Sequence, residues 1–205
     1  MPTHTFFNLP EEKQQRILDA AIKEFSQRGV EEGNLANIIR DAGISRGSLY
    51  QYFDNKAELY AYLFTKLRNE RADYAQPAFA LYKTKSFLEF FRQFYLLDSE
   101  YLLAHPSHID LGKRLYTGTD SISKGLIQRQ QTRYKEWFLV AIEHDKDRGE
   151  IDKQVDSSVL ADLCVHFVTD IFIFQSVQTQ ISIYNLRDNL DKMLYLIQHG
   201  ISPNL

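Results

Sequence analysis

Apolar residues recur along the chain at the three- and four-residue spacing of helices, so the sequence predicts successive amphipathic helices with short connections. The first helix has an apolar stripe over residues 17–25 and ends at Gly29. It begins near Asn8 to Pro10, where either Asn8 and Glu11 form a capping box or Pro10 occupies the first turn. Proline is sparse and we find no repeat or low-complexity tract, which favours an all-α fold.

Longer helices are predicted after about residue 60. One covers residues 59–67 and leads to Pro77, and another covers residues 87–97 and runs towards Pro106. A third begins near Ser121 and stops at Gly149. These are the helices expected of a bundle.

The last two predicted helices have different apolar patterns. The helix that follows an Asp156 cap is apolar nearly all round through residue 174, so it should be buried on two sides. The final helix, over residues 186–197, keeps one apolar stripe. Together they predict a self-complementary four-helix interface of a homodimer. The alternative is that both helices belong entirely to a monomeric core.

A length of 205 residues suits one small module and one larger domain. We predict a small three-helix domain over residues 1–56. A larger helical domain is predicted over residues 57–205.

Composition excludes several classes of protein. Cys164 is the only cysteine, which rules out an intrachain disulfide and a thiolate metal cluster and suits the cytoplasm. No apolar run is long enough to span a bilayer, and residues 1–10 lack a basic leader, so we expect no membrane association. No cofactor is expected.

The net charge of the chain does not indicate a nucleic-acid ligand. The whole chain carries −3, and residues 1–60 hold seven basic and nine acidic side chains. Most of these acids precede Asn34, whereas Arg40, Arg46 and Lys56 bracket the segment described next. Attraction to phosphate should therefore be local and modest.

Residues 34–56 contain two short helices and a tight turn. Asn34 can cap the first helix and Gly43 can end it. Ser45 can cap the second helix, with Ile44 and Leu49 forming a hydrophobic staple. Two helices joined by a three-residue, glycine-containing turn are typical of a helix-turn-helix.

At about 100° per residue, Leu49 and Phe53 mark the buried side of the second helix. Gly47 and Gln51 lie opposite them; Ser48, Tyr50 and Tyr52 lie to the sides. Gln51 can read adenine and Ser48 can bond a base or phosphate, while Gly47 lets the backbone approach phosphate closely.

The flanking side chains suit the DNA backbone. Arg46 falls near the buried side, so we favour a phosphate contact for it over a base contact. Asn55 and Glu58 resemble a capping box that places Lys56 in the first turn of the next helix, beside phosphate. Alternatively, Tyr50 and Tyr52 pack against neighbouring helices, Lys56 is a solvated lysine, and Gly47 is tolerated rather than used.

Two runs carry a family resemblance. Residues 17–29 read ILDAAIKEFSQRG, and residues 42–53 read AGISRGSLYQYF, with Lys56 three residues later. Over about residues 12–63 the chain resembles the N-terminal domain of the TetR family of transcriptional regulators. Ile39 departs from the pattern, because the family usually has a small alanine there.

The resemblance implies a homodimer that reads a palindromic operator in successive major grooves, and a small-molecule effector that releases the DNA. The rest of the chain is similar to members of that family only in helix pattern and length. The positions that match DNA contacts of the family are Leu35, Ser45, Arg46, Gly47, Ser48, Tyr50, Gln51, Tyr52 and Lys56.

An effector pocket is expected within residues 60–180, largely apolar with a few polar groups. The candidate lining residues are polar or amphipathic side chains on apolar helices: Tyr95, Tyr116, Trp137, His166 and Asp170. His166 and Asp170 are four residues apart and can bond each other, either in the pocket or at the dimer interface. Without a third metal ligand or a nucleophile beside them, the sequence does not predict an enzyme. The alternative function is a helical regulator or binding module controlled by a partner protein.

Overall fold

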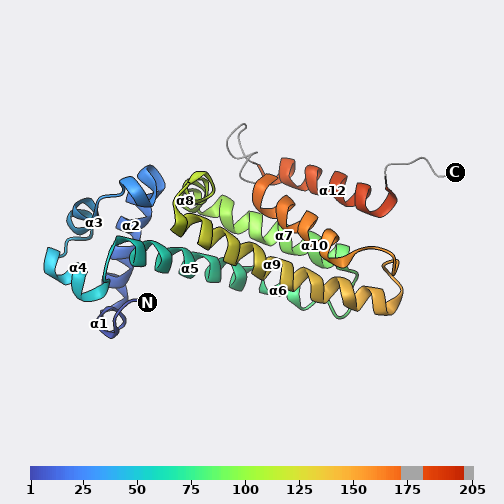
Figure 1. Cartoon of the computed structure of the whole chain (residues 1–205), viewed down its shortest axis with the longest axis horizontal. Helices are drawn as coiled ribbons and strands as arrows, with labels where there is room; N and C mark the ends of the chain where they lie inside the picture. Colours follow the sequence, from blue (N-terminus) through green and yellow to red (C-terminus); the bar gives the residue numbers. More distant parts are fainter. Residues whose placement is uncertain (172–181, 201–205) are drawn as a thin grey trace. The chain divides into compact units, whose positions relative to one another are not determined.

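The computed structural model describes residues 1–171 and 182–200, and every regular element in these ranges is a helix (Figure 1). The N-terminal part holds α1 (His4–Phe7), α2 (Glu11–Glu32), α3 (Leu35–Ala42), α4 (Arg46–Tyr52) and α5 (Lys56–Tyr74). The rest holds α6 (Gln76–Phe79), α7 (Phe87–Ala104), α8 (Pro106–Thr117), α9 (Ser121–Arg148), α10 (Ser157–His166), a π-helical turn (Phe167–Ile171) and α12 (Ile183–His199). The predicted all-α fold is confirmed.

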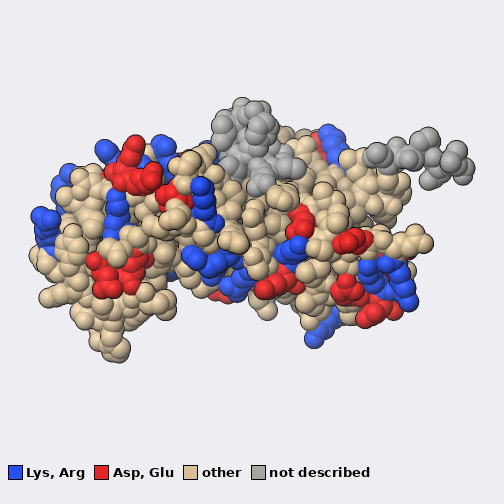
Figure 2. Space-filling model, in the orientation of Figure 1, with Lys and Arg blue, Asp and Glu red and all other residues tan. Residues whose placement is uncertain are grey.

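The chain forms two compact units. The first contains residues 1–70 and 105–130, and the second contains residues 71–104 and 131–205. The changes from one unit to the other fall within α5, between α7 and α8, and within α9. The first unit thus holds the predicted helix-turn-helix together with α8. On the face shown in Figure 2, basic and acidic side chains are intermingled over both units.

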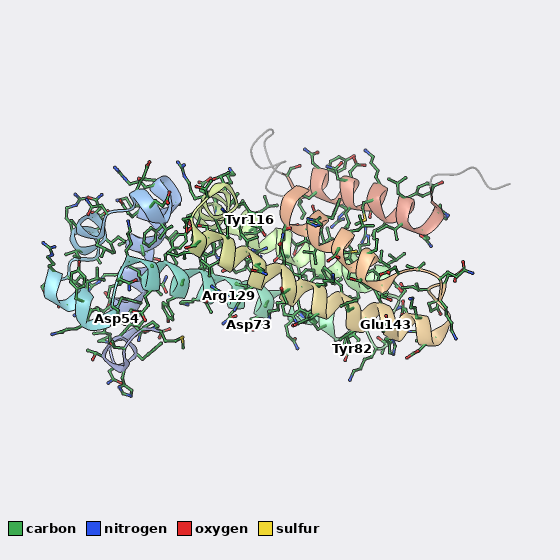
Figure 3. The ribbon with its side chains drawn as sticks, in the orientation of Figure 1. Asp54, Asp73, Tyr82, Tyr116, Arg129 and Glu143 are labelled. Carbon is green, nitrogen blue, oxygen red and sulfur yellow. The ribbon has the colours of Figure 1, made fainter. Side chains whose placement is uncertain are left out.

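The core of the first unit is built from α1, α2, α3, α4, α5, α8 and the start of α9. Ile17, Phe25, Ile38 and Leu59 are fully buried in it. From α8 come the buried Leu111 and Leu115, and the half-buried Tyr116, which is labelled in Figure 3, packs against the same core.

The second unit has an aromatic core. Phe91 and Phe94 on α7 lie against Phe138 on α9, with ring centroids 5.2 and 5.6 Å apart. Arg71 on α5 donates to both carboxylate oxygens of the buried Asp98 on α7. Burial raises the pKa of the Cys164 thiol to about 12, so this side chain stays protonated as a small apolar group.

Several helix ends agree with the sequence analysis. Asp156 caps α10 by accepting the Val159 N–H at 3.0 Å, and Gly149 follows α9 with φ +76°. Gly29, with φ +71°, interrupts the regular helix within α2, and one more turn follows it. This helix starts at Glu11, beside the predicted range Asn8 to Pro10, but its capping differs: Pro10 is the N-cap, and the Asn8 side chain bonds His4 in α1. Within the described residues, no helix is long and apolar enough to cross a membrane.

Candidate nucleic-acid interface

The turn between α3 and α4 has the local structure that its sequence predicts. The Asn34 side chain accepts the Ala36 N–H at 2.8 Å and starts α3. Gly43 ends α3 in the left-handed region, at φ +64°. Ser45 accepts the Ser48 N–H at 3.1 Å and starts α4. The predicted helix-turn-helix is therefore present.

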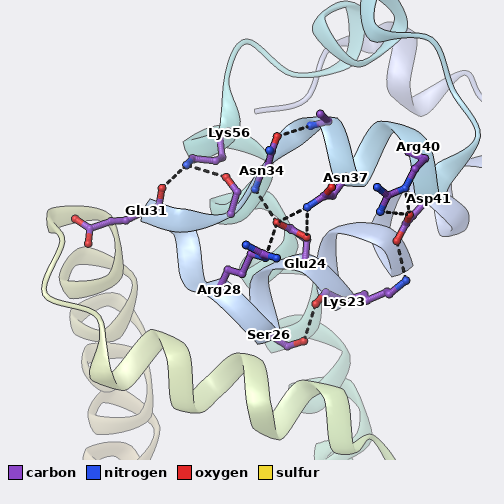
Figure 4. Close-up of polar contacts among 12 residues, drawn as sticks. Lys23, Glu24, Ser26, Arg28, Glu31, Asn34, Asn37, Arg40, Asp41 and Lys56 are labelled. Atoms are coloured by element: carbon purple, nitrogen blue, oxygen red, sulfur yellow. Dashed lines mark hydrogen bonds and ion pairs between the residues drawn. The ribbon is translucent and has the colours of Figure 1, made fainter.

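Buried Glu24 of α2 fixes the entrance to α3. Its carboxylate accepts the Asn34 backbone N–H at 2.8 Å and the Asn37 side-chain amide at 3.2 and 3.1 Å (Figure 4). Arg28 lies 3.4 Å from the same carboxylate. A buried carboxylate needs such donors, because one left unpaired is costly. Glu24 thus positions α3, and sequence reasoning missed it because the partners come from a different helix.

The exposed face of α4 is close to the predicted one. Leu49 and Phe53 are buried, whereas Arg46, Gly47 and Gln51 are exposed. Outside its own helix, no heavy atom lies within 4 Å of the position that a Cβ on Gly47 would take. Nothing in the free protein therefore requires glycine there.

Two residues that are predicted to contact DNA have side chains that are buried or half-buried. Tyr52 is 4% exposed, and its ring lies 6.2 Å from that of Phe6 in α1. This matches the packing alternative rather than the expected place beside the exposed face. The cause is α1, which the sequence analysis did not predict. Leu35 is half-buried against the core of the first unit.

The other predicted contacts around α4 are available from solvent. Tyr50 is 48% exposed and Ser45 is exposed. Ser48 is half-buried, and its hydroxyl lies 2.7 Å from the Ser45 hydroxyl. These two hydroxyls form a small polar group at the N-terminus of α4, where backbone N–H groups favour an anion.

Lys56 has a structural role that the sequence did not suggest. Its ammonium donates to the backbone carbonyls of Glu31, at 2.7 Å, and Gly33, at 3.0 Å (Figure 4). Both carbonyls lie at the C-terminal end of α2, where a cation is favourable. Two of the three N–H groups are therefore committed within the free protein. Contact with phosphate stays a prediction.

Replacing Lys56 by methionine should lower the free energy of unfolding by about 1–2 kcal/mol, because two helix-end carbonyls lose a charged donor. Urea denaturation measures this difference. Lys124→Met is the matched control, since Lys124 is exposed on α9, and its loss should stay within about 0.5 kcal/mol. Equal stability of the two variants would remove the structural role of Lys56.

The capping pattern before α5 is confirmed in part. Asn55 accepts the Glu58 N–H at 2.9 Å, as predicted. The Glu58 carboxylate, however, accepts the Asp54 N–H at 2.6 Å rather than that of Asn55. The segment after α4 is fixed by these two bonds.

The basic residues near α3 are partly neutralised. Asp41 accepts from Lys23 at 2.7 Å and from Arg40 at 2.9 Å. The hydrogen bond from Lys23, followed by that from Arg40, lowers the pKa of Asp41, so its carboxylate stays ionised. Within the described part of the chain, Arg46 forms no ion pair with an acidic side chain. It is therefore the freer cation beside α4.

The predicted effector residues are divided between the two compact units. Tyr116 belongs to the first unit, and Tyr95, Trp137 and His166 belong to the second. Tyr95 is buried, with its ring 5.2 Å from that of Phe167, and burial raises the pKa of its hydroxyl. Trp137 packs on Phe79 at 4.8 Å, and His166 is exposed on α10. The side chain of Asp170 lies outside the described residues.

A three-helix unit with a capped turn and an exposed, polar second helix defines the class of helix-turn-helix DNA-binding proteins. The sequence profile of the family described as "Bacterial regulatory proteins, tetR family" matches residues 17–63. Residues 17–63 thus carry the sequence signature of this family.

Two regulators match a short part of the sequence. HTH-type transcriptional regulator AcrR of Shigella flexneri is 41% identical over 51 residues, which is 25% of this chain and 24% of that protein. SrpR of Pseudomonas putida is 45% identical over 49 residues, covering 24% and 23%. The chain thus matches about a quarter of the length of each.

A longer match includes the C-terminal part. The fatty acid metabolism regulator protein of Bacillus subtilis is 26% identical over 165 residues, covering 73% of this chain and 85% of that protein. Like the two regulators above, it is a regulator rather than an enzyme.

Solved structures share the whole fold. FadR from Bacillus subtilis, in complex with stearoyl-CoA, superposes with a TM-score of 0.76 at 17% identity over 92% of this chain and 99% of that chain. A TetR family transcriptional regulator from Chloroflexus aurantiacus superposes with a TM-score of 0.74 at 21% identity over the full length of both chains. A helical C-terminal domain after the helix-turn-helix is thus the shared architecture.

Proposed function

We propose that this cytoplasmic regulator binds a palindromic operator as a homodimer and represses transcription until a small, largely apolar effector releases it. Each α4 enters one of two successive major grooves. The observation that supports the DNA part most strongly is the outer face of α4, where Gly47 and Gln51 are exposed. This helix is capped by Ser45 and anchored by the buried Leu49. Residues 1–56 are the proposed DNA-binding domain.

Gln51 is the proposed base reader, because its amide can donate to and accept from one adenine edge. Arg46, Tyr50, Ser45 and Ser48 lie around it and supply donors to phosphate. For Tyr52 only a contact through its hydroxyl fits this proposal, since the ring is buried.

Replacing Gln51 by alanine should change the preferred base at one position in each half-site and lower discrimination there by about 1–3 kcal/mol. Fluorescence anisotropy with a fragment of the DNA upstream of the gene, and with single-base variants of its site, measures this. Glu12→Ala is the matched control, since Glu12 is exposed at the start of α2. A uniform loss across all sequences would contradict the base-reading role of Gln51.

The homodimer would use apolar side chains that a single chain leaves in water. On α10 Val159 and Leu163 are 56% and 58% exposed, and on α12 Leu196 is 52% exposed and Tyr195 is 63% exposed. Exposed apolar residues on two helices support an interface with a second copy. The proposed effector-binding and dimerisation domain is residues 57–205.

For the effector we propose a chemical class, an apolar small molecule. The relative named as a fatty acid metabolism regulator and the FadR complex with stearoyl-CoA support an apolar effector. The aromatic core of the second unit is the kind of surface that such a molecule would contact. Tyr95, Tyr116, Trp137, His166 and Asp170 stay as predicted contacts.

A further inference from the structure

A hollow of about 750 Å³ lies on the second unit. It is lined by the start of α7, the end of α9 and the segment after it, α10, and the end of α12. Its apolar lining includes Phe87, Leu88, Ile151, Leu160 and Ile197, together with Val159 and Leu163, which the proposed dimer interface also uses. This volume is within the usual range of small-molecule sites. None of the predicted effector residues lines it.

The polar lining of this hollow carries one sign of charge. It contains the carboxylates of Glu89, Asp145, Glu150, Asp152 and Asp156, and no lysine, arginine or histidine is among the lining residues. A hollow with an apolar wall strengthens the attraction between such carboxylates and a cation, because low-dielectric surroundings screen charge less than water does.

Two cations outside the lining balance part of this charge. Arg148 lies 3.6 Å from Glu150 and 3.8 Å from Asp145, and Lys85 lies 3.8 Å from Glu89. Asp152 and Asp156 accept backbone N–H groups, and within the described ranges we find no ion pair to either. A net negative charge therefore remains around the hollow.

Asp145 is a buried carboxylate of this lining, and one of its oxygens has no hydrogen-bond donor within the described residues. Its side chain is 1% exposed, and its Oδ2 accepts the Phe87 N–H at 2.6 Å. Its Oδ1 accepts no hydrogen bond within the described residues, and His144 and Arg148 approach it only to 3.7 and 3.8 Å. A buried carboxylate oxygen without a donor is costly, so a ligand that donates here would relieve that cost.

We propose that this hollow binds an organic cation with an apolar body and a protonated amine. The apolar lining would contact the body, the carboxylates would attract the charge, and Asp145 would accept an N–H. A metal ion fits poorly, because the described residues contain no group of three or more His, Cys, Asp or Glu side chains arranged to hold one. This inference does not depend on DNA binding.

Three adamantane compounds with the same apolar body test the proposal by calorimetric titration of the full chain without DNA. They are 1-adamantylamine, 1-adamantanol and 1-adamantanecarboxylate, which are cationic, neutral and anionic at pH 7. The amine should bind at least about tenfold more tightly than the carboxylate, with the alcohol between them. Binding of all three with equal affinity, or of none, would overturn the proposal.

Variants locate the site. Glu150→Gln together with Asp152→Asn should weaken the amine at least about threefold, and Asp145→Asn should weaken it further. Glu143→Gln is the matched control, since Glu143, labelled in Figure 3, is exposed on α9 and is not among the residues that line the hollow. The double variant keeps the test valid if Asp145→Asn fails to fold. Unchanged affinity of the double variant for the amine, or an equal loss of affinity in the control, would contradict the assignment.

Discussion

Replacing Gly47 by alanine will stabilise the free protein and yet weaken its binding to DNA at least about tenfold. In the free chain a Cβ at this position meets nothing within 4 Å outside its helix. Alanine is the better helix former by up to about 1 kcal/mol. On DNA, however, the proposed contact brings the backbone at Gly47 against a phosphate. A methyl group on this residue would push the phosphate away from the backbone. The two effects therefore have opposite signs.

Thermal unfolding and anisotropy with operator DNA measure the two effects separately. Gly125→Ala is the matched control, because Gly125 lies inside α9 and its Cβ would meet only Arg129, at 3.6 Å. It should stabilise the protein similarly and leave DNA affinity unchanged. If Gly47→Ala bound DNA as tightly as the wild type, close approach at this residue would be wrong.

The second large effect concerns the dimer. Leu163→Glu combined with Leu196→Glu should convert the protein to a monomer and lower its affinity for the full operator at least about a hundredfold, because the two half-sites would no longer be bound by one particle. Both side chains are more than half exposed in the single chain, so the fold should survive.

Sedimentation equilibrium gives the mass, and circular dichroism checks the helices. Val140→Glu is the matched control, since Val140 is an apolar residue on α9 that is 59% exposed. It should remain dimeric. A double variant that stays dimeric would exclude this face as the interface.

Local features of the helix-turn-helix were predictable because they depend on neighbours in sequence. The caps by Asn34 and Ser45 and the left-handed Gly43 are each set within a few residues. The same holds for the Asp156 cap of α10.

Features that depend on distant partners were not predictable. Helix periodicity placed Tyr52 beside the exposed face, but Phe6 of α1 provides it with a buried neighbour. Lys56 contacts carbonyls 23 and 25 residues earlier in the chain. The helix predicted to run towards Pro106 ends at Ala104, but the separate helix α8 that begins at Pro106 was not predicted.

The cavity on the second unit was also out of reach. Its carboxylates come from α7, from α9 and from the segment between α9 and α10. Glu89 on α7 is far from the others in sequence. Periodicity identifies the apolar face of each helix but not the places where several helix ends meet. The predicted effector residues were chosen as polar groups on apolar helices, and that rule does not detect acidic side chains in connecting segments.

The most direct test of the central claim is selection of binding sites by the wild-type chain from a library of random double-stranded DNA. We expect one enriched palindrome, bound by two chains, whose half-site centres lie about one helical turn apart. Its affinity should fall as salt rises, as expected for phosphate contacts. A library with no enriched sequence, or an asymmetric site bound by one chain, would contradict it.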